Sequence, residues 1–165
     1  MPDGARSVLA ERADGLYISD DPALLDRPRI RSWLATSYWA SDRSAEAIDV
    51  SITNSRSYAA YTADGTQVAL ARVTTDLASF AWIGDVIVDE RLRGQGIGRW
   101  LVGTAVEHLR ALGVPRFVLA TRDAHGVYAA LGFEPLRVPQ TWMEIDLRAT
   151  RPNPADVPQY VPPVD

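Results

Sequence analysis

The apolar residues in the first third of the chain recur at helical spacing. From Pro28 to Ser37, three apolar residues fall at positions i, i+3 and i+4, which places them on one face of a helix. A second stretch with this spacing begins at Ser44. A short strand is predicted before both, from Gly15 to Asp20. This part of the sequence therefore predicts one strand followed by two amphipathic helices.

The apolar period changes to two in the middle of the chain. Residues 57–62 and 67–74 are rich in Val, Tyr and Thr, which are typical of strands. The dipeptide Asp64-Gly65 lies between them and is a strong hairpin signal. A third strand is predicted at 80–88 after another short turn. These residues predict an antiparallel meander.

The later part of the chain alternates between helices and strands. A glycine- and arginine-rich loop at 91–96 is followed by a long helix at 97–112, whose apolar residues are three and four apart. The apolar run 116–121 predicts a strand that is central and buried on both faces. A short helix at 124–131 and a last strand at 141–147 complete the order. We therefore predict an α/β (α+β) fold, with one mixed, mostly antiparallel central sheet flanked by helices.

The length of 165 residues fits one domain. We expect a loose N-terminal tail at 1–14, a single domain at 15–148 and a proline-rich C-terminal tail at 149–165. No secretory signal and no run long enough for a membrane helix are seen in the sequence. The expected location is the cytoplasm, without membrane association.

Composition excludes several classes of chemistry. The chain has no cysteine, so disulfides, cysteine nucleophiles and thiolate metal sites are ruled out. All 17 basic residues are arginine, which removes Schiff-base catalysis and the standard P-loop. The presence of only two histidines argues against a histidine-based zinc site, and no metal is expected. The net charge of −4 argues against nucleic acid as a partner.

The loop before the long helix has the composition of an anion site. The first N–H groups of a helix lack partners within it, and the helix dipole adds positive charge there. Glycines allow those N–H groups to approach a ligand closely, and guanidinium groups suit phosphate. Three glycines and three arginines lie at this junction: Gly94, Gly96, Gly98, Arg91, Arg93 and Arg99. The expected ligand is a phosphate or pyrophosphate.

Two common phosphate motifs do not fit this loop. The dinucleotide fingerprint requires glycine where Arg99 stands, and the Walker pattern requires a lysine. A glycine-rich turn with solvated arginines is the plain structural alternative. The combination of glycines, arginines and a transition from strand to helix favours the binding site.

Two segments resemble signatures of the GNAT superfamily of N-acetyltransferases. Residues 91–98, Arg-Leu-Arg-Gly-Gln-Gly-Ile-Gly, resemble its acetyl-CoA signature, Arg/Gln-x-x-Gly-x-Gly/Ala. Val86-Ile87-Val88 matches the apolar strand end that precedes it, and residues 127–133 resemble the second signature, Leu-Tyr-x-x-x-Gly-Phe. The resemblance is specific over 80–133 and looser over 16–76, where only the element order agrees.

The resemblance implies a way of holding acetyl-CoA, the expected co-substrate. The backbone of Val86, Ile87 and Val88 would pair with the pantetheine arm in a gap where this strand is splayed from the next parallel strand. Backbone N–H groups would hold the pyrophosphate, and they belong to Arg93, Gly94, Gln95, Gly96, Ile97 and Gly98. Thr121 stands where many members carry Asn, and its hydroxyl can still donate and accept one hydrogen bond.

The resemblance also implies that Tyr128 protonates the departing thiolate. A tyrosine hydroxyl has an ordinary pKa of about 10 and is protonated at neutral pH; its alternative role is packing. A backbone N–H near Val86 or Ile87 would stabilise the carbonyl oxygen. Asp85 is the candidate base, with Glu144 as the other option, and Asp85 is equally well explained as a structural carboxylate. His125, three residues before Tyr128, could carry protons, contact the cofactor or simply begin the helix; His108 is expected at the surface.

The predicted function is transfer of an acetyl group from acetyl-CoA to a primary amine. A small-molecule acceptor is favoured over a protein, and dimers are common in the family, so a homodimer is one option. The acceptor pocket is expected near the first helices, with these candidates: Tyr38, Trp39, Ser51, Asn54, Ser55 and Trp142. The alternatives are a non-catalytic acyl-CoA sensor of the same fold and a nucleotide-binding structural protein.

Overall fold

The computed structural model describes residues 7–148, and the chain forms two compact units that divide after Ala120. The strands are β1 (Val8–Glu11), β2 (Tyr17–Ser19), β3 (Arg56–Tyr61), β4 (Gln67–Thr75), β5 (Ala81–Val88) and β6 (Phe117–Leu119). The helices are α1 (Arg27–Ala35), α2 (Ala45–Thr53), α3 (Ile97–Ala111) and α4 (His125–Ala129). Short 3-10 turns are η1 (Pro22–Leu24), η2 (Glu90–Leu92) and η3 (Pro139–Thr141).

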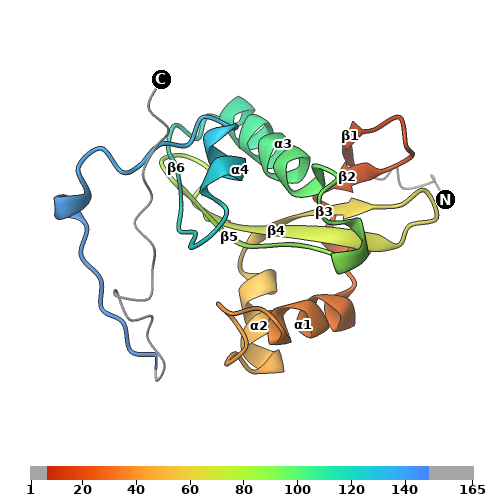
Figure 1. Ribbon diagram of the computed structural model, residues 1–165, viewed down its shortest axis with the longest axis horizontal. Helices are drawn as coiled ribbons and strands as arrows, with labels where there is room; N and C mark the ends of the chain where they lie inside the picture. Colours follow the sequence, from red (N-terminus) through yellow and green to blue (C-terminus); the bar gives the residue numbers. More distant parts are fainter. Residues whose placement is uncertain (1–6, 149–165) are drawn as a thin grey trace. The chain divides into compact units, whose positions relative to one another are not determined.

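The six strands form one sheet in the order of the sequence (Figure 1). All neighbouring strands run antiparallel except β5 and β6, which are parallel. The fold class predicted from the sequence is confirmed: a mixed, mostly antiparallel sheet flanked by helices. In the first unit, α3 covers one face of the sheet, and α1 and α2 cover the other (Figure 1).

The helices begin where the sequence supplies caps. Asp26 accepts a hydrogen bond from the Arg29 N–H at 3.0 Å and begins α1. Ser44 accepts one from the Ala47 N–H at 3.1 Å and begins α2. At the other end of α3, Gly113 has φ of +100°, a left-handed conformation that ends the helix.

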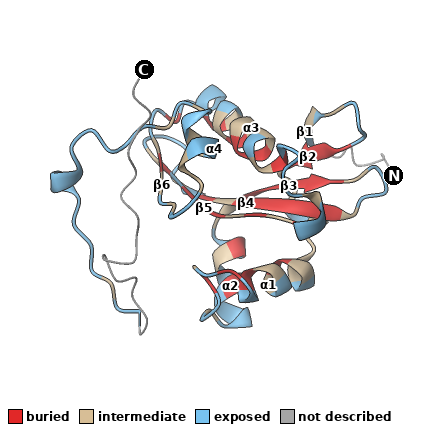
Figure 2. Cartoon of the chain, in the orientation of Figure 1, coloured by how far each residue is buried: buried red, intermediate tan, exposed pale blue. Residues whose placement is uncertain are grey.

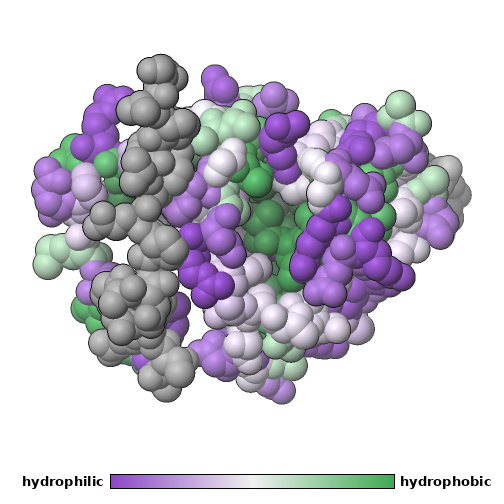
Figure 3. All heavy atoms as spheres, viewed as in Figure 1, coloured by the Kyte–Doolittle hydropathy of each residue, from purple (hydrophilic) through white to green (hydrophobic). Residues whose placement is uncertain are grey.

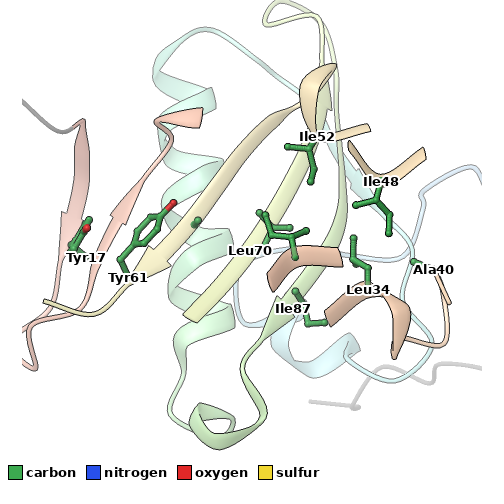
Figure 4. Packing of buried hydrophobic residues seen from close by; sticks show 10 residues of the cluster. Tyr17, Leu34, Ala40, Ile48, Ile52, Tyr61, Leu70 and Ile87 are labelled. Atoms are coloured by element: carbon green, nitrogen blue, oxygen red, sulfur yellow. The ribbon is translucent and has the colours of Figure 1, made fainter. Parts of the chain in front are cut away.

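The core of the first unit lies on both faces of the sheet. Figure 2 shows buried residues along the central strands and on the helix sides that face them. On the face of α1 and α2, Leu34, Ile48 and Ile52 pack against Leu70 and Ile87 of the sheet (Figure 4). Burial of each such side chain contributes about 1.5–3 kcal/mol and fixes these helices over β4 and β5.

The strand β5 has an irregularity that positions the site. Gly84 pairs with Arg72 and Ile87 with Leu70, so Asp85 and Val86 together oppose Ala71 in a β-bulge. Asp85 has φ of +48°, which is rare for a residue other than glycine. Such bulges redirect side chains and often lie beside functional sites.

On its other side β5 is only partly paired. Its register with β6 runs from Ala81↔Phe117 to Ile83↔Leu119, and no pairing with β6 follows among the described residues. β5 itself continues to Val88. The last residues of β5 therefore have no pairing with β6, which ends at Leu119. On the face of the molecule drawn in Figure 3, apolar side chains line a hollow near the middle, where Figure 1 places β4 and β5.

The structure corrects the predictions for two segments of the sheet. Val8–Glu11, predicted as part of a loose tail, forms the edge strand β1, which at four residues is too short for an alternating pattern to be recognised. The strand predicted at 116–121 as central is the short β6 at the end of the sheet order, and only Val118 is buried. An apolar run does not reveal whether a strand has one neighbour or two.

The last predicted strand, at 141–147, is absent from the described residues. Its place is taken by η3 and a segment without regular structure, in which Met143 and Ile145 are 97% and 90% exposed. Alternating residues make a strand only when a neighbouring strand supplies backbone partners. The tail predicted at 149–165 lies outside the described residues. No helix within 7–148 is long and apolar enough to span a membrane.

Candidate functional site

The loop between β5 and α3 is held in a shape that requires glycine. Gly94 and Gly96 have φ of +78° and +73°, in the left-handed region. A Cβ at either position would meet no atom within 4 Å, so the loop surface is open there. Gly98 has a different role, since its Cβ would lie 3.4 Å from a methyl group of Val88. It allows the start of α3 to approach the end of β5 closely.

The same loop presents a row of unused backbone donors. Gly96 caps α3 without a side-chain hydrogen bond, and the first N–H to find a partner in the helix is that of Trp100, which donates to the Gly96 carbonyl at 3.0 Å. Over the described part of the chain, the N–H groups of residues 94–99 donate to no other group. Successive free N–H groups at a helix N-terminus form an anion site.

The arginines of the loop differ in how tightly they are held. Arg91 makes a paired contact with Asp89, at 3.0 Å from both Nε and Nη2, and the bonds from Arg91 hold the pKa of Asp89 below its usual value. Arg93 donates from Nε to the Val88 carbonyl at 3.2 Å. Arg99 is exposed, and the structure gives its side chain no partner within the described residues. In Figure 3, polar side chains lie to the right of the hollow.

Arg12, which lies between β1 and β2, contacts the glycine loop. Its Nη1 donates to the Gln95 carbonyl at 3.2 Å, and its guanidinium lies 5.4 Å from the ring centroid of Trp100. Sequence reasoning missed this residue because it falls in the predicted tail. The contact holds the Gln95 carbonyl and so fixes the path of the glycine loop.

Asp85 is buried among three donors beside the bulge. Its carboxylate accepts from Arg72 Nε at 2.7 Å, from Arg43 Nη1 at 2.9 and 3.0 Å, and from the Trp39 indole at 3.1 Å. Its side chain is 1% exposed, and that of Arg72 is 13% exposed. Burial alone would raise the pKa of Asp85, but the charges and hydrogen bonds of the two arginines outweigh it and lower the pKa.

These contacts argue against the predicted role of Asp85 as a general base. A carboxylate with a lowered pKa binds a proton weakly, and both of its oxygens are already occupied by donors. The contacts fit its other predicted role, that of a structural carboxylate. Asp85 ties Trp39 and Arg43, which follow α1, to β4 and β5.

We expect Asp85→Asn to lower the free energy of unfolding by about 3 kcal/mol at neutral pH, because Arg72 loses its buried counter-charge. The folded pKa of Asp85 is lowered, so its stabilisation is present above the unfolded value of about 3.9 and is lost as pH falls through the folded value. Thermal melts from about pH 2 to about pH 7 span the unfolded pKa of Asp85 and measure both effects. A variant that melts with the parent protein at neutral pH would contradict the structural role.

A base would leave a different signature in the same variant. If Asp85 removed the proton of the acceptor, raising the pH would partly restore the turnover of Asp85→Asn, since more acceptor would already be neutral. If Asp85 only positions its neighbours, the pH profile of turnover keeps the shape of the parent profile. The melting curve and this profile together separate the two roles.

Family models and solved structures agree on one assignment. The model of the acetyltransferase (GNAT) family matches residues 23–133. The chain belongs to the GNAT acetyltransferase family. A protein of Xanthomonas campestris pv. campestris assigned to the GNAT family is 37% identical, with a TM-score of 0.76, over 84% of this chain and 96% of that one. Among curated proteins, none matches the sequence.

Two more distant structures share the GNAT fold. Glucosamine-6-phosphate N-acetyltransferase from Arabidopsis thaliana is 17% identical, with a TM-score of 0.60, over 81% of this chain and 99% of that one. N-acetylglutamate synthase from Neisseria gonorrhoeae, complexed with coenzyme A and N-acetyl-glutamate, is 19% identical, with a TM-score of 0.58. It is matched over 73% of this chain and 28% of its own. At these identities the likeness concerns the fold.

The remaining GNAT signature residues lie in the second unit. Tyr128 is on α4, half-buried, with its ring 6.0 Å from the Phe133 ring in an edge-on arrangement. His125 is the first residue of α4. The Thr121 hydroxyl accepts a hydrogen bond from the Ala124 N–H at 3.0 Å, so it helps to turn the chain into α4. Glu144 lies in the exposed segment after η3.

The predicted acceptor residues divide into several groups. Ser51 and Asn54 donate to carbonyls of Ile48 and Val50 and so serve the end of α2. Trp39 contacts Asp85, and the Ser55 hydroxyl accepts from Arg72 Nη1 at 2.9 Å. Tyr38 follows α1, where its ring lies edge-on to that of Trp39, and Trp142 follows η3 in the second unit. Of this set, Trp39 and Ser55 each contact the ion pair of Arg72 and Asp85.

His108 is not the simple surface residue that was expected. Its ring lies edge-on to Tyr58, and Nδ1 is 3.2 Å from the Tyr58 hydroxyl. Asp20 is 3.9 Å from the same nitrogen. Burial raises the pKa of Tyr58 to about 12, so this hydroxyl stays protonated at neutral pH. The arrangement joins α3 to β3 and to Asp20, which follows β2.

Proposed function

We propose that this protein transfers an acetyl group from acetyl-CoA to a primary amine. The observation that carries the proposal is the row of unused N–H groups at residues 94–99, which follows the end of β5. That end pairs with β4 on one side and has no pairing with β6 on the other. A backbone row of this kind suits a pyrophosphate, and a strand end with one free side suits an extended amide-bearing arm. Acetyl-CoA contains both groups in one molecule.

The proposed binding mode divides acetyl-CoA between the loop and the strand. The pyrophosphate lies against the N–H groups of the glycine loop, with Arg99 as an additional cation at its edge. Arg91 and Arg93 already contact Asp89 and Val88, so we assign them to shaping the loop and its positive field. The pantetheine arm pairs with the backbone from Val86 to Val88.

The proposed reaction is a direct attack on the thioester. The amine nitrogen bonds to the carbonyl carbon, the C–S bond breaks, and the amine proton passes to water. A backbone N–H near Val86 or Ile87 stabilises the carbonyl oxygen as negative charge develops. The Tyr128 hydroxyl gives its proton to the departing thiolate and regains one from water, so the proton lost by the amine balances the proton gained by the thiol. Asp85 takes no proton in this scheme and holds Trp39 and the two arginines in place.

Binding and turnover measured together test this function. We expect CoA to bind in calorimetry more tightly than ATP or NAD, and acetyl-CoA to release free thiol when a primary amine is added. If CoA binds but acetyl-CoA releases no thiol in the presence of any amine of a broad panel, the protein is an acyl-CoA sensor. A preference for ATP or NAD would contradict the proposal and indicate a nucleotide-binding protein.

A further inference from the structure

Two nitrogen atoms that carry N–H groups border the space above Gly84, on β5 just before the bulge. A Cβ built on Gly84 would lie 3.3 Å from Trp82 Nε1 and 3.6 Å from Arg72 Nη2. Gly84 is half-buried and Trp82 is exposed, so solvent reaches this space. Because position 84 carries no side chain, an oxygen atom of a ligand can occupy the region that both donors border.

Arg72 is fixed so that one end of its guanidinium remains available. Its Nε donates to Asp85 at 2.7 Å, and its Nη1 lies within reach of Ser55 at 2.9 Å and Thr74 at 3.3 Å. Within residues 7–148, the structure gives no partner to Nη2 of Arg72 or to the indole N–H of Trp82. A planar guanidinium held by contacts at Nε and Nη1 presents Nη2 in a fixed direction.

The charge of this cluster is not balanced. Arg43 and Arg72 both pair with the carboxylate of Asp85, so these three side chains carry a net charge of +1. Arg43 uses only Nη1 in these contacts, and its side chain is 32% exposed. An excess positive charge beside free donors favours an anionic ligand group over a neutral one.

We propose that Arg72, Trp82 and Gly84 form a subsite for a carboxylate on the acceptor, so that the acceptor is an amino carboxylate. The inference rests on the proposed function, because it names the acceptor class of that same site. Gly84 is two residues before Val86 and, with the bulge at Asp85 between them, lies at most about 6–7 Å from it along β5. A carboxylate bound above Gly84 therefore places an amine a few bonds away near the carbonyl of the thioester.

The test uses pairs of ligands that differ only in charge. N-acetylglycine and N-acetyl-β-alanine are compared with their carboxamides, by following the indole N–H signals of the protein in NMR titrations. The chain has five tryptophans, and the signal of Trp82 is the one that disappears in Trp82→Phe. We expect the carboxylates to shift this signal with a Kd about tenfold or more below that of the amides, as charge-assisted hydrogen bonds predict.

Two variants and a control complete the binding test. Gly84→Ala places a methyl group in the subsite and is expected to abolish the response of the Trp82 signal to carboxylates. Trp33→Phe removes an indole N–H on α1, outside the subsite, and is expected to leave the preference for carboxylates unchanged. CoA affinity and melting temperature are measured for each variant, to show that the loop and the fold are intact. Equal responses to carboxylate and amide, or no response of Trp82, would overturn the subsite.

Turnover separates this inference from the proposed function. Amino acids and their amides are compared as acceptors, and we expect kcat/KM to favour the carboxylate about tenfold or more, with the preference lost in Gly84→Ala. Acetylation of amines without that preference would overturn the subsite and leave the acetyltransferase proposal standing. Carboxylate binding at Trp82 without acetylation of any amine would support the subsite and count against the transferase.

Discussion

Replacing Tyr128 with phenylalanine is expected to lower turnover by about 10²–10⁴ and to leave CoA affinity nearly unchanged. The substitution keeps the aromatic ring, which lies edge-on to Phe133, and removes only the hydroxyl. Loss of a general acid costs about this factor because the thiolate must then leave without a proton or take one from water. Steady-state thiol release and CoA calorimetry on the same preparation measure the two quantities.

The control is a second tyrosine that loses its hydroxyl elsewhere. Tyr61 is buried in β3, and its hydroxyl has no partner within the described residues. Tyr61→Phe is therefore expected to retain the turnover of the parent protein. If Tyr128→Phe also retains it, Tyr128 serves packing, which was the alternative interpretation of this residue.

Replacing Gly96 with valine is expected to weaken CoA binding by about 100-fold or more. The branched side chain would project into the open surface where the N–H groups are exposed, and it would remove several charge-assisted hydrogen bonds of about 1.5–3 kcal/mol each. Calorimetry with CoA measures the loss. Unchanged affinity would contradict the assignment of this loop as the pyrophosphate site.

A matched glycine at the opposite end of α3 separates binding from strain. Gly113 has φ of +100°, and a Cβ there would also meet no atom within 4 Å. Gly96→Val and Gly113→Val therefore impose similar backbone strain, and both are expected to lower the melting temperature. Only Gly96→Val should weaken CoA binding, because Gly113 lies at the C-terminal end of the helix.

Local features of the sequence were sufficient to predict the glycine loop. Gly94 and Gly96 are needed because of their own backbone angles, and the spacing of apolar residues in α3 reports the face that packs on the sheet. The hairpin at Asp64-Gly65 is similarly local. These features depend on neighbours in sequence, so a single chain is enough to detect them.

The surroundings of Asp85 could not be predicted in this way. Arg43 is 42 residues before it and Arg72 is 13 before it, and only the pairing of β4 with β5 and the path after α1 bring them together. The sequence shows an acidic residue within a predicted strand, which fits a base and a structural carboxylate equally. The contact of Arg12 with the loop has the same origin, since it joins residues 83 apart.

Strand neighbours were the other feature that local patterns did not reveal. The alternation at 141–147 is typical of a strand, but strand formation depends on a partner with free backbone groups. The run at 116–121 is apolar throughout, and this pattern alone does not separate a central strand from an edge strand such as β6. Both errors concern tertiary pairing and leave the element order around the site unaffected.

The most direct test of acetyl transfer is mass spectrometry of the products formed from acetyl-CoA and an amino carboxylate. We predict an acceptor that gains one acetyl group on its nitrogen, with one free CoA formed for each acetylated molecule. The use of acetyl-CoA labelled in the acetyl group identifies the source. Release of CoA with labelled acetate and no acetylated amine, or intact acetyl-CoA after incubation with the whole panel of amines, would contradict the account.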